Sequence, residues 1–247
     1  MVKLPSILIE TLRKQEVTDQ FGNTAPLDSN VSESEAASLY EAISTTAPIA
    51  SVEIGLAHGV SAMAIIGAIA QIKAGHHHII DPHQRRYGYT GKTMLERAGY
   101  APYFTLYEKI AAEVLPGLGP IQFALIDSSH LFDLTIEEFV LIDRKLLVGG
   151  IVAFHDLWMP SIRSVIRYIL NNRAYEVWRG YTPKAASTSA RQNIAKWMAW
   201  VLSRVPNGSR LFAPSLMQPI DYESLGNLVF LRKLANDIRD WRYHKPF

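Results

Sequence analysis

The stretch Ser51-Val52-Glu53-Ile54-Gly55-Leu56-Ala57-His58-Gly59-Val60-Ser61 decides the fold of this chain. A short β-type run breaks into small residues, and an uncharged apolar run from 61 to 72 follows at once. Glycines let a backbone approach a ligand closely, and the first turn of a helix offers free N–H groups. The pattern therefore predicts a strand, a ligand-binding turn and a helix, as in an open α/β sheet that holds a nucleoside. Asp81, which closes the next apolar run, stands where such sheets place the carboxylate that binds ribose hydroxyls.

The composition is that of a folded protein with little net charge. The 247 residues are 48% hydrophobic and 19% charged, and the formal charge is +2. The only adjacent arginines are Arg85 and Arg86, so we expect no nucleic-acid partner. No run approaches the roughly 20 apolar residues of a membrane span, and the start of the chain lacks the long apolar region of a signal peptide. The absence of cysteine excludes disulfides and a thiolate nucleophile and agrees with a cytoplasmic location.

Strand and helix signals alternate along most of the chain. Ser32 and Glu35 form a capping box that predicts a helix over 33–44. Short apolar strands separated by helices predict a mostly parallel, doubly wound, Rossmann-like sheet with helices on both faces. We expect strands at 49–54, 77–80, 104–107, 123–126, 151–154, 175–179 and 228–232, and helices at 61–72, 91–98, 111–115, 133–147 and 160–170.

This organisation predicts a single domain with an insertion. Residues 1–46 form an N-terminal extension, with a short amphipathic piece near 7–12, a polar loop over 18–30 and the first helix. Residues 47–179 and 228–235 form the core, and 180–227 form a helical insertion before the last strand. Within the insertion, apolar residues recur at helical spacing: Ile194, Trp197, Met198, Val201, Leu202 and Val205. This stripe is compatible with a helix packed on the domain, a lid over the site or the face of a homodimer.

Five segments, in order, resemble the class I S-adenosylmethionine-dependent methyltransferases. The likeness covers roughly residues 48–170 and the strand at 228–232, and it is closest to the branch that O-methylates small molecules and sugars, which includes magnesium-dependent catechol-type enzymes. The segments are Glu53-x-Gly55-x-x-x-Gly59, Ile80-Asp81-Pro82, the run from Tyr107 to Pro116, the run from Leu125 to His130, and the run from Gly149 to Asp156.

The resemblance implies a binding site for S-adenosylmethionine. The methionine and ribose parts of the cofactor would lie against Gly55, Leu56, Ala57 and Gly59. Glu53 would orient this turn or the cofactor's amino group, Asp81 would accept hydrogen bonds from both ribose hydroxyls, and adenine would lie between Ile110 and Ala111. Many relatives have glycine at the position of Ala57, and a methyl group is tolerated there if φ stays below zero.

The resemblance also places the chemical centre at the ends of the fourth and fifth strands. Catechol-type relatives hold magnesium with an acid after the fourth strand and two oxygen ligands after the fifth, and a lysine three positions after the first acid takes the proton. Here Asp127 and Asp156 match two metal positions, His155 replaces an oxygen ligand, and His130 stands at the lysine position. Trp158, just after the fifth strand, is the candidate contact for the acceptor.

Two mechanisms remain open from the sequence. In one, His130 is a metal-free general base, since histidine has an ordinary pKa of about 6.5, and Asp127 orients either His130 or the bound cofactor. In the other, Asp127, His155 and Asp156 bind a divalent metal, either magnesium or an ion softer than magnesium. The histidines His76-His77-His78 cannot all form one metal site, because consecutive strand residues point to opposite faces.

We therefore expect an S-adenosylmethionine-dependent methyltransferase acting on a hydroxyl of a small molecule or sugar. Three alternatives stay open: N-methylation, a cofactor-binding protein without turnover, and an NAD-dependent oxidoreductase on the same fold. The last normally carries Gly-x-Gly-x-x-Gly, which the stretch from Gly55 to Gly59 does not satisfy.

Overall fold

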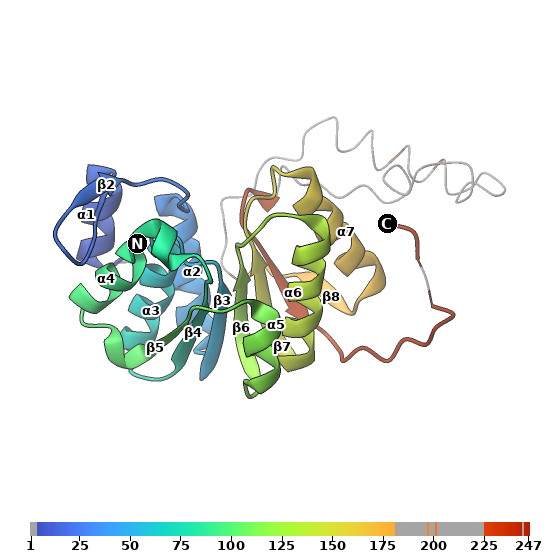
Figure 1. Cartoon of the computed structure of the whole chain (residues 1–247). Coiled ribbons are helices and arrows are strands. Elements are labelled where there is room, and N and C mark those ends of the chain that lie inside the picture. The colour runs from blue at the N-terminus through green and yellow to red at the C-terminus, as the bar shows by residue number, and fades with distance from the viewer. Residues whose placement is uncertain (1–3, 181–196, 198–200, 202–224, 244) are drawn as a thin grey trace.

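A seven-stranded sheet forms the centre of the computed structural model, which describes residues 4–180, 197, 201, 225–243 and 245–247 (Figure 1). The strand order is β5-β4-β3-β6-β7-β9-β8, and only β9 runs antiparallel to its neighbours. This arrangement confirms the predicted mostly parallel, doubly wound sheet. The strands are β3 (Ala50–Ile54), β4 (His76–Ile80), β5 (Phe104–Tyr107), β6 (Ile121–Ile126), β7 (Leu146–Phe154), β8 (Tyr175–Val177) and β9 (Val229–Lys233).

Helices cover both faces of this sheet (Figure 1). On one face lie α2 (Glu33–Thr46), α3 (Val60–Ile72) and α4 (Thr90–Arg97), with α1 (Ser6–Lys14) packed against α3, and on the other face lie α5 (Ala111–Val114), α6 (Phe132–Lys145) and α7 (Pro160–Asn172). Side chains alternate between two buried clusters along each strand, as Ile79 and Ile80 of β4 illustrate. Residues on one strand therefore face opposite helical layers, and the carboxyl ends of β3, β6 and β7 meet at one edge.

Two segments differ from the sequence-based expectation. The polar segment 18–30 was expected to be a loop, but β1 (Glu16–Thr18) and β2 (Thr24–Pro26) form a small antiparallel hairpin. The Asp19 carboxylate closes it by accepting hydrogen bonds from the backbone N–H groups of Phe21 and Asn23. The second difference lies at the end of the helix predicted over 133–147. This helix ends at Lys145, and Leu146 is already extended and pairs with Ile121. The apolar character of 146–148 suited either structure.

The predicted insertion falls mostly on residues outside the described part of the chain. Of its apolar stripe, only Trp197 and Val201 are described, and both side chains are exposed. Among the helices that the structure describes, none is both long and apolar enough to cross a bilayer.

Candidate active site

A cavity of about 510 Å³ opens at the carboxyl ends of β3, β6 and β7. This volume lies within the range of small-molecule sites, and the position is where open α/β sheets bind ligands. The walls come from the turns after the three strands and from the N-terminal segment before α2. They comprise Ser29, Asn30, Val31, Gly55, Leu56, Ala57, Val60, Ser61, Tyr87, Asp127, Ser128, His130, His155, Asp156 and Met159.

The glycine turn after β3 is shaped by close approach to neighbouring backbone. Gly55 has φ +95°, and a Cβ there would lie 2.0 Å from the carbonyl oxygen of Asp127. Gly59 has φ +79° and precedes α3, and a Cβ there would lie 2.9 Å from Cα of Gly91. No other residue fits both the backbone angle and the space at these positions.

Ala57 corrects one expectation about this turn. Its φ is +45°, in the left-handed region, whereas the sequence argument required φ below zero for a methyl group to be tolerated. An L-residue in this region costs about 1–2 kcal/mol. The turn therefore carries strain at a residue that lines the cavity.

The carboxylate of Asp81 stabilises the same turn through hydrogen bonds. One of its carboxylate oxygens accepts hydrogen bonds from the backbone N–H groups of Leu56 (3.0 Å) and Ala57 (3.1 Å), and from the Gln84 amide (2.7 Å). The other oxygen accepts from the N–H of His83 at 2.7 Å. Asp81 is 4% exposed and is not part of the cavity wall, so its present partners are the turn itself.

The predicted adenine contacts also lie off the cavity wall. Ile110 precedes α5 and is 52% exposed, while Ala111 is buried in the layer beneath the sheet. Neither residue lines the cavity. Their contact with adenine stays a prediction.

Glu53 is fully buried and belongs to a polar group under the turn. Its carboxyl group accepts a hydrogen bond from Ser61, in the first turn of α3, and lies 3.2 Å from Nε2 of His77. Nδ1 of His77 lies 2.9 Å from the Ser51 hydroxyl. Burial raises the pKa of Glu53 and lowers the pKa of His77 to about 3, so we assign a neutral pair rather than an ion pair. The Ser61 contact agrees with a role for Glu53 in orienting the turn.

Asp127, His130 and Asp156 converge at the cavity. Nε2 of His130 lies 3.1 Å from a carboxylate oxygen of Asp127 and 3.1 Å from one of Asp156. These two carboxylates, Asp127 first, raise the pKa of His130 to about 9, and the imidazolium in turn lowers the pKa of Asp156. At neutral pH, His130 is therefore a protonated donor between two acids. This differs from the predicted base with an ordinary pKa, because the sequence could not show that both acids contact the same nitrogen.

His155 lies beside this group and connects it to α2. Its Nδ1 is 3.4 Å from Asp127 and 3.4 Å from Asp156, and its Nε2 is 3.4 Å from Glu35. Burial alone would lower the pKa of His155, but the bonds to Asp127 and Glu35 outweigh it and raise that pKa to about 10. The Asn227 amide lies 3.1 Å from Nε2 of His155 and donates to Asp156 at 3.3 Å.

The polar partners Glu35, Ser61 and Asn227 were not predicted from the sequence as members of the site, and neither were the other residues of the cavity wall, namely Ser29, Asn30, Val31, Val60, Tyr87, Ser128 and Met159. Glu35 does form the predicted capping box with Ser32, and the oxygen not used there faces His155. The sequence signal for Glu35 was present but indicated only a helix start. Ser61 lies two residues after Gly59, and Asn227 lies two residues before β9, but nothing in their spacing pointed to the cavity.

Trp158 stands at the mouth of the site and is 63% exposed. Its indole N–H donates to Asp156 at 3.0 Å, and its backbone N–H donates to the Asn227 side chain at 3.3 Å. The ring therefore stands next to the acidic group without forming part of the cavity wall.

The donor set suits a divalent cation. Asp127, His130 and Asp156 each offer one ligand atom, and these three atoms all lie within 4.8 Å of one another. His155 Nδ1 faces both carboxylates as well. A mixed nitrogen and oxygen set suits zinc, manganese or iron better than magnesium, which prefers oxygen.

Comparison with known proteins finds a family similar to the core of the chain. Residues 52–157 match a protein family described as a methyltransferase domain. No curated protein matches the chain significantly.

Solved structures give the fold of the whole core. The O-methyltransferase TomG of Streptomyces achromogenes, in complex with S-adenosylmethionine, is 18% identical with TM-score 0.56, over 72% of this chain and 83% of that one. An O-methyltransferase of Bacillus cereus, bound to S-adenosylhomocysteine, is 14% identical with TM-score 0.58, over 72% and 84%. A third, from Thermotoga maritima, is 10% identical with TM-score 0.58, over 95% of this chain and 74% of that one. Residues 52–157 thus match a methyltransferase-domain family, and the chain has the Rossmann-like fold that these S-adenosylmethionine-dependent O-methyltransferases share.

Proposed function

We propose that this protein transfers the methyl group of S-adenosylmethionine to a hydroxyl group of a small molecule or sugar. One observation carries the proposal: the turn of the methyltransferase domain and the group formed by Asp127, His130 and Asp156 line the same cavity. The cofactor would occupy the part of the cavity beside Gly55, Leu56 and Ala57.

The walls of this part of the cavity suit the cofactor. The open approach along Gly55, Leu56 and Ala57 leaves room for an extended ligand, and α3 begins there with free N–H groups that favour a carboxylate. Asp81 would accept hydrogen bonds from the ribose hydroxyls directly, if it released one of its hydrogen bonds from the turn. Otherwise it would support ribose binding indirectly, by fixing the turn through the N–H groups of Leu56 and Ala57. S-adenosylmethionine, when bound, supplies the electrophilic methyl group.

The residues of the chain would then position and deprotonate the acceptor. The acceptor hydroxyl must lie in line with the methyl group and lose its proton as the new bond forms. His130 is the candidate to receive that proton, which requires its imidazole to be neutral at that moment. Asp127 and Asp156 fix the ring of His130 through the two contacts of 3.1 Å.

A divalent cation would be held by Asp127 and Asp156, with His155 as the nitrogen ligand. These carboxylates also raise the pKa of His130, so their neutralisation by a cation would favour the neutral imidazole. We propose a metal-assisted reaction for this reason. The exposed Trp158 ring would contact the acceptor at the mouth of the site.

The proposal also covers the location, the partners and the oligomeric state of the protein. We infer a cytoplasmic protein from the lack of cysteine, with no nucleic-acid partner because of its small net charge. A homodimer would use the exposed apolar positions Trp197 and Val201.

Calorimetric titration with S-adenosylhomocysteine tests the cofactor, with NAD as the control ligand and with either magnesium, manganese or a chelator present. We expect micromolar binding of S-adenosylhomocysteine and no heat from NAD. Binding of NAD alone would replace the proposal with an oxidoreductase. With cofactor binding established, methyl transfer to panels of hydroxyl and amine acceptors would separate O-methylation from N-methylation, and transfer to neither would support a binding protein without turnover.

A further inference from the structure

The three consecutive histidines of β4 are not used by the proposed reaction. His77 points to the α3 face, where it is fully buried between Ser51 and Glu53. His76 and His78 point to the opposite face, on the same side of the sheet as Ile80. His76 and His78 therefore lie side by side on one face of the sheet, and His77 is buried on the other.

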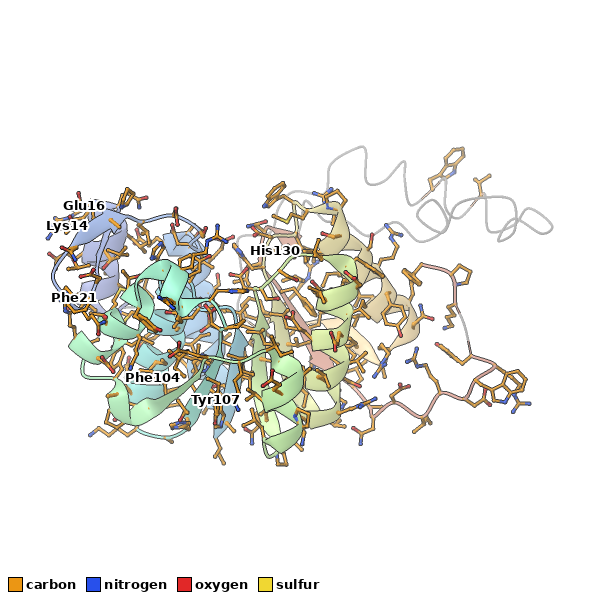
Figure 2. The ribbon with its side chains drawn as sticks, in the orientation of Figure 1. Lys14, Glu16, Phe21, Phe104, Tyr107 and His130 are labelled. Atoms are coloured by element: carbon orange, nitrogen blue, oxygen red, sulfur yellow. The ribbon has the colours of Figure 1, made fainter. Side chains whose placement is uncertain are left out.

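We propose that His76 and His78 bind a divalent transition-metal ion of the zinc, nickel or copper class. The site is separate from the active-site cavity, since neither histidine lines that cavity. Figure 2 shows Tyr107, whose hydroxyl contacts His78, well apart from His130.

The ring geometry fits two ligands of one ion. The ring centroids of His76 and His78 lie 5.1 Å apart, with an angle of 63° between the planes. Two imidazoles that bind one tetrahedral ion, with metal–nitrogen distances of about 2.0–2.1 Å, have centroids about 5 Å apart. The separation of the two rings therefore matches that of two ligands of one ion.

Hydroxyl groups of the neighbouring strand fix both rings. Nε2 of His76 lies 2.9 Å from the Thr105 hydroxyl, and Nδ1 of His78 lies 3.3 Å from the Tyr107 hydroxyl. Within the described part of the chain, Nδ1 of His76 and Nε2 of His78 make no hydrogen bond, so these are the nitrogens left for a metal. Metal-binding histidines typically use one nitrogen for the ion and the other for such an orienting hydrogen bond.

The surroundings keep the pair accessible. Both histidines are half-buried, and α5, the helix that follows β5 on this face, has only four residues. Neutral nitrogen ligands select borderline transition metals, and water would complete the coordination.

Zinc titration of the full chain without an affinity tag tests the proposal. The variants are the double change His76→Gln and His78→Gln, the matched control His83→Gln at an exposed histidine three residues beyond β4, and Asp156→Asn in the active site. We expect the double variant to bind one zinc ion fewer per chain than the wild type, whereas His83→Gln binds the same number. Asp156→Asn should retain the event that the double variant loses, which separates it from any active-site metal.

Two further measurements identify the ligands. Zinc should shift the ring-nitrogen resonances of His76 and His78 in ¹⁵N-histidine spectra, while magnesium should leave them unchanged. Thr105→Val should weaken zinc binding about tenfold, as loss of an orienting partner does elsewhere. Identical zinc stoichiometry in the wild type and a folded double variant, confirmed by its thermal melting curve, would overturn the proposal, as would zinc binding that disappears entirely in Asp156→Asn.

Discussion

Gly55→Ala tests how the turn after β3 is held against the end of β6. The added Cβ would lie 2.0 Å from the carbonyl oxygen of Asp127 and 2.8 Å from its carbonyl carbon. Contacts below 3.0 Å are essentially never seen for Cβ atoms, so the turn and Asp127 must move apart by about 1 Å or more. Because the clash is with backbone, no side-chain rotation can relieve it.

The expected loss of stability has two parts. A left-handed φ of +95° costs a non-glycine residue about 1–2 kcal/mol. Moving the turn also weakens the bonds from Gly55 N–H to Ile80 (2.9 Å) and from Asp127 N–H to Ile54 (3.0 Å), each worth about 1 kcal/mol. The total is about 3–4 kcal/mol, which lowers the melting temperature by about 10 °C in a domain of this size.

Gly149→Ala is the matched control. Gly149 has φ +87°, yet a Cβ there would meet no atom within 4 Å. This variant should lose only the backbone part, about 1–2 kcal/mol. Urea unfolding of both variants measures the difference, and equal losses would refute the argument that close approach to Asp127 dictates glycine at position 55. Displacing Asp127 by about 1 Å should also reduce turnover by up to about a hundredfold, whereas Gly149→Ala should leave turnover unchanged.

Three further predictions concern the histidines and their partners. His130→Ala should lower turnover by about 10²–10⁴ while leaving the affinity for S-adenosylhomocysteine nearly unchanged, and a collapse of that affinity would argue against the base assignment. Glu35→Gln should remove a charged partner of His155 and lower the pKa of that imidazole, measured by ¹⁵N-histidine titration, while helix content stays constant because glutamine also serves in capping boxes. An unchanged His155 titration would contradict the contact. Burial lowers the pKa of His77 to about 3 in the folded protein, whereas the unfolded chain has the ordinary value of about 6.5. Between these pH values the unfolded chain binds a proton at His77 and the folded protein does not. Stability should therefore fall as pH drops from about 6.5 toward 3, and His77→Gln should show a shallower fall in urea unfolding; equal slopes would count against the assignment.

The sequence was most informative where structure depends on neighbours along the chain. The apolar runs at β3, β4 and β6 and the Ser32–Glu35 capping box were predicted because each is encoded within a few residues. The meeting of Asp127, His130 and Asp156 was also predictable, because the carboxyl ends of neighbouring parallel strands share one edge. The hairpin at 16–26 was not, since its strands are too short to carry a periodic signal.

What the sequence could not supply was the set of contacts between distant segments. Glu35 reaches His155 only because α2 starts beside the end of β7, and Asn227 reaches Asp156 only because β9 inserts next to β7. The backbone angle of Ala57 likewise depends on how Asp81 holds the turn, through the N–H groups that its carboxylate binds. Local propensity has no access to either kind of information.

These contacts change how the two proposed mechanisms relate to each other. The negative charge of Asp127 and Asp156 can be balanced by the protonated imidazoles of His130 and His155, whose pKa values are raised, or by a divalent cation. The imidazolium of His130 and a divalent metal ion would contact the same carboxylate oxygens, so metal binding and protonation of His130 compete. A metal-free base would have to release a proton that two carboxylates retain up to about pH 9, which makes it inefficient at neutral pH. We therefore propose metal-assisted deprotonation, in which His130 would become a competent base because the charge of its two partners would already be balanced.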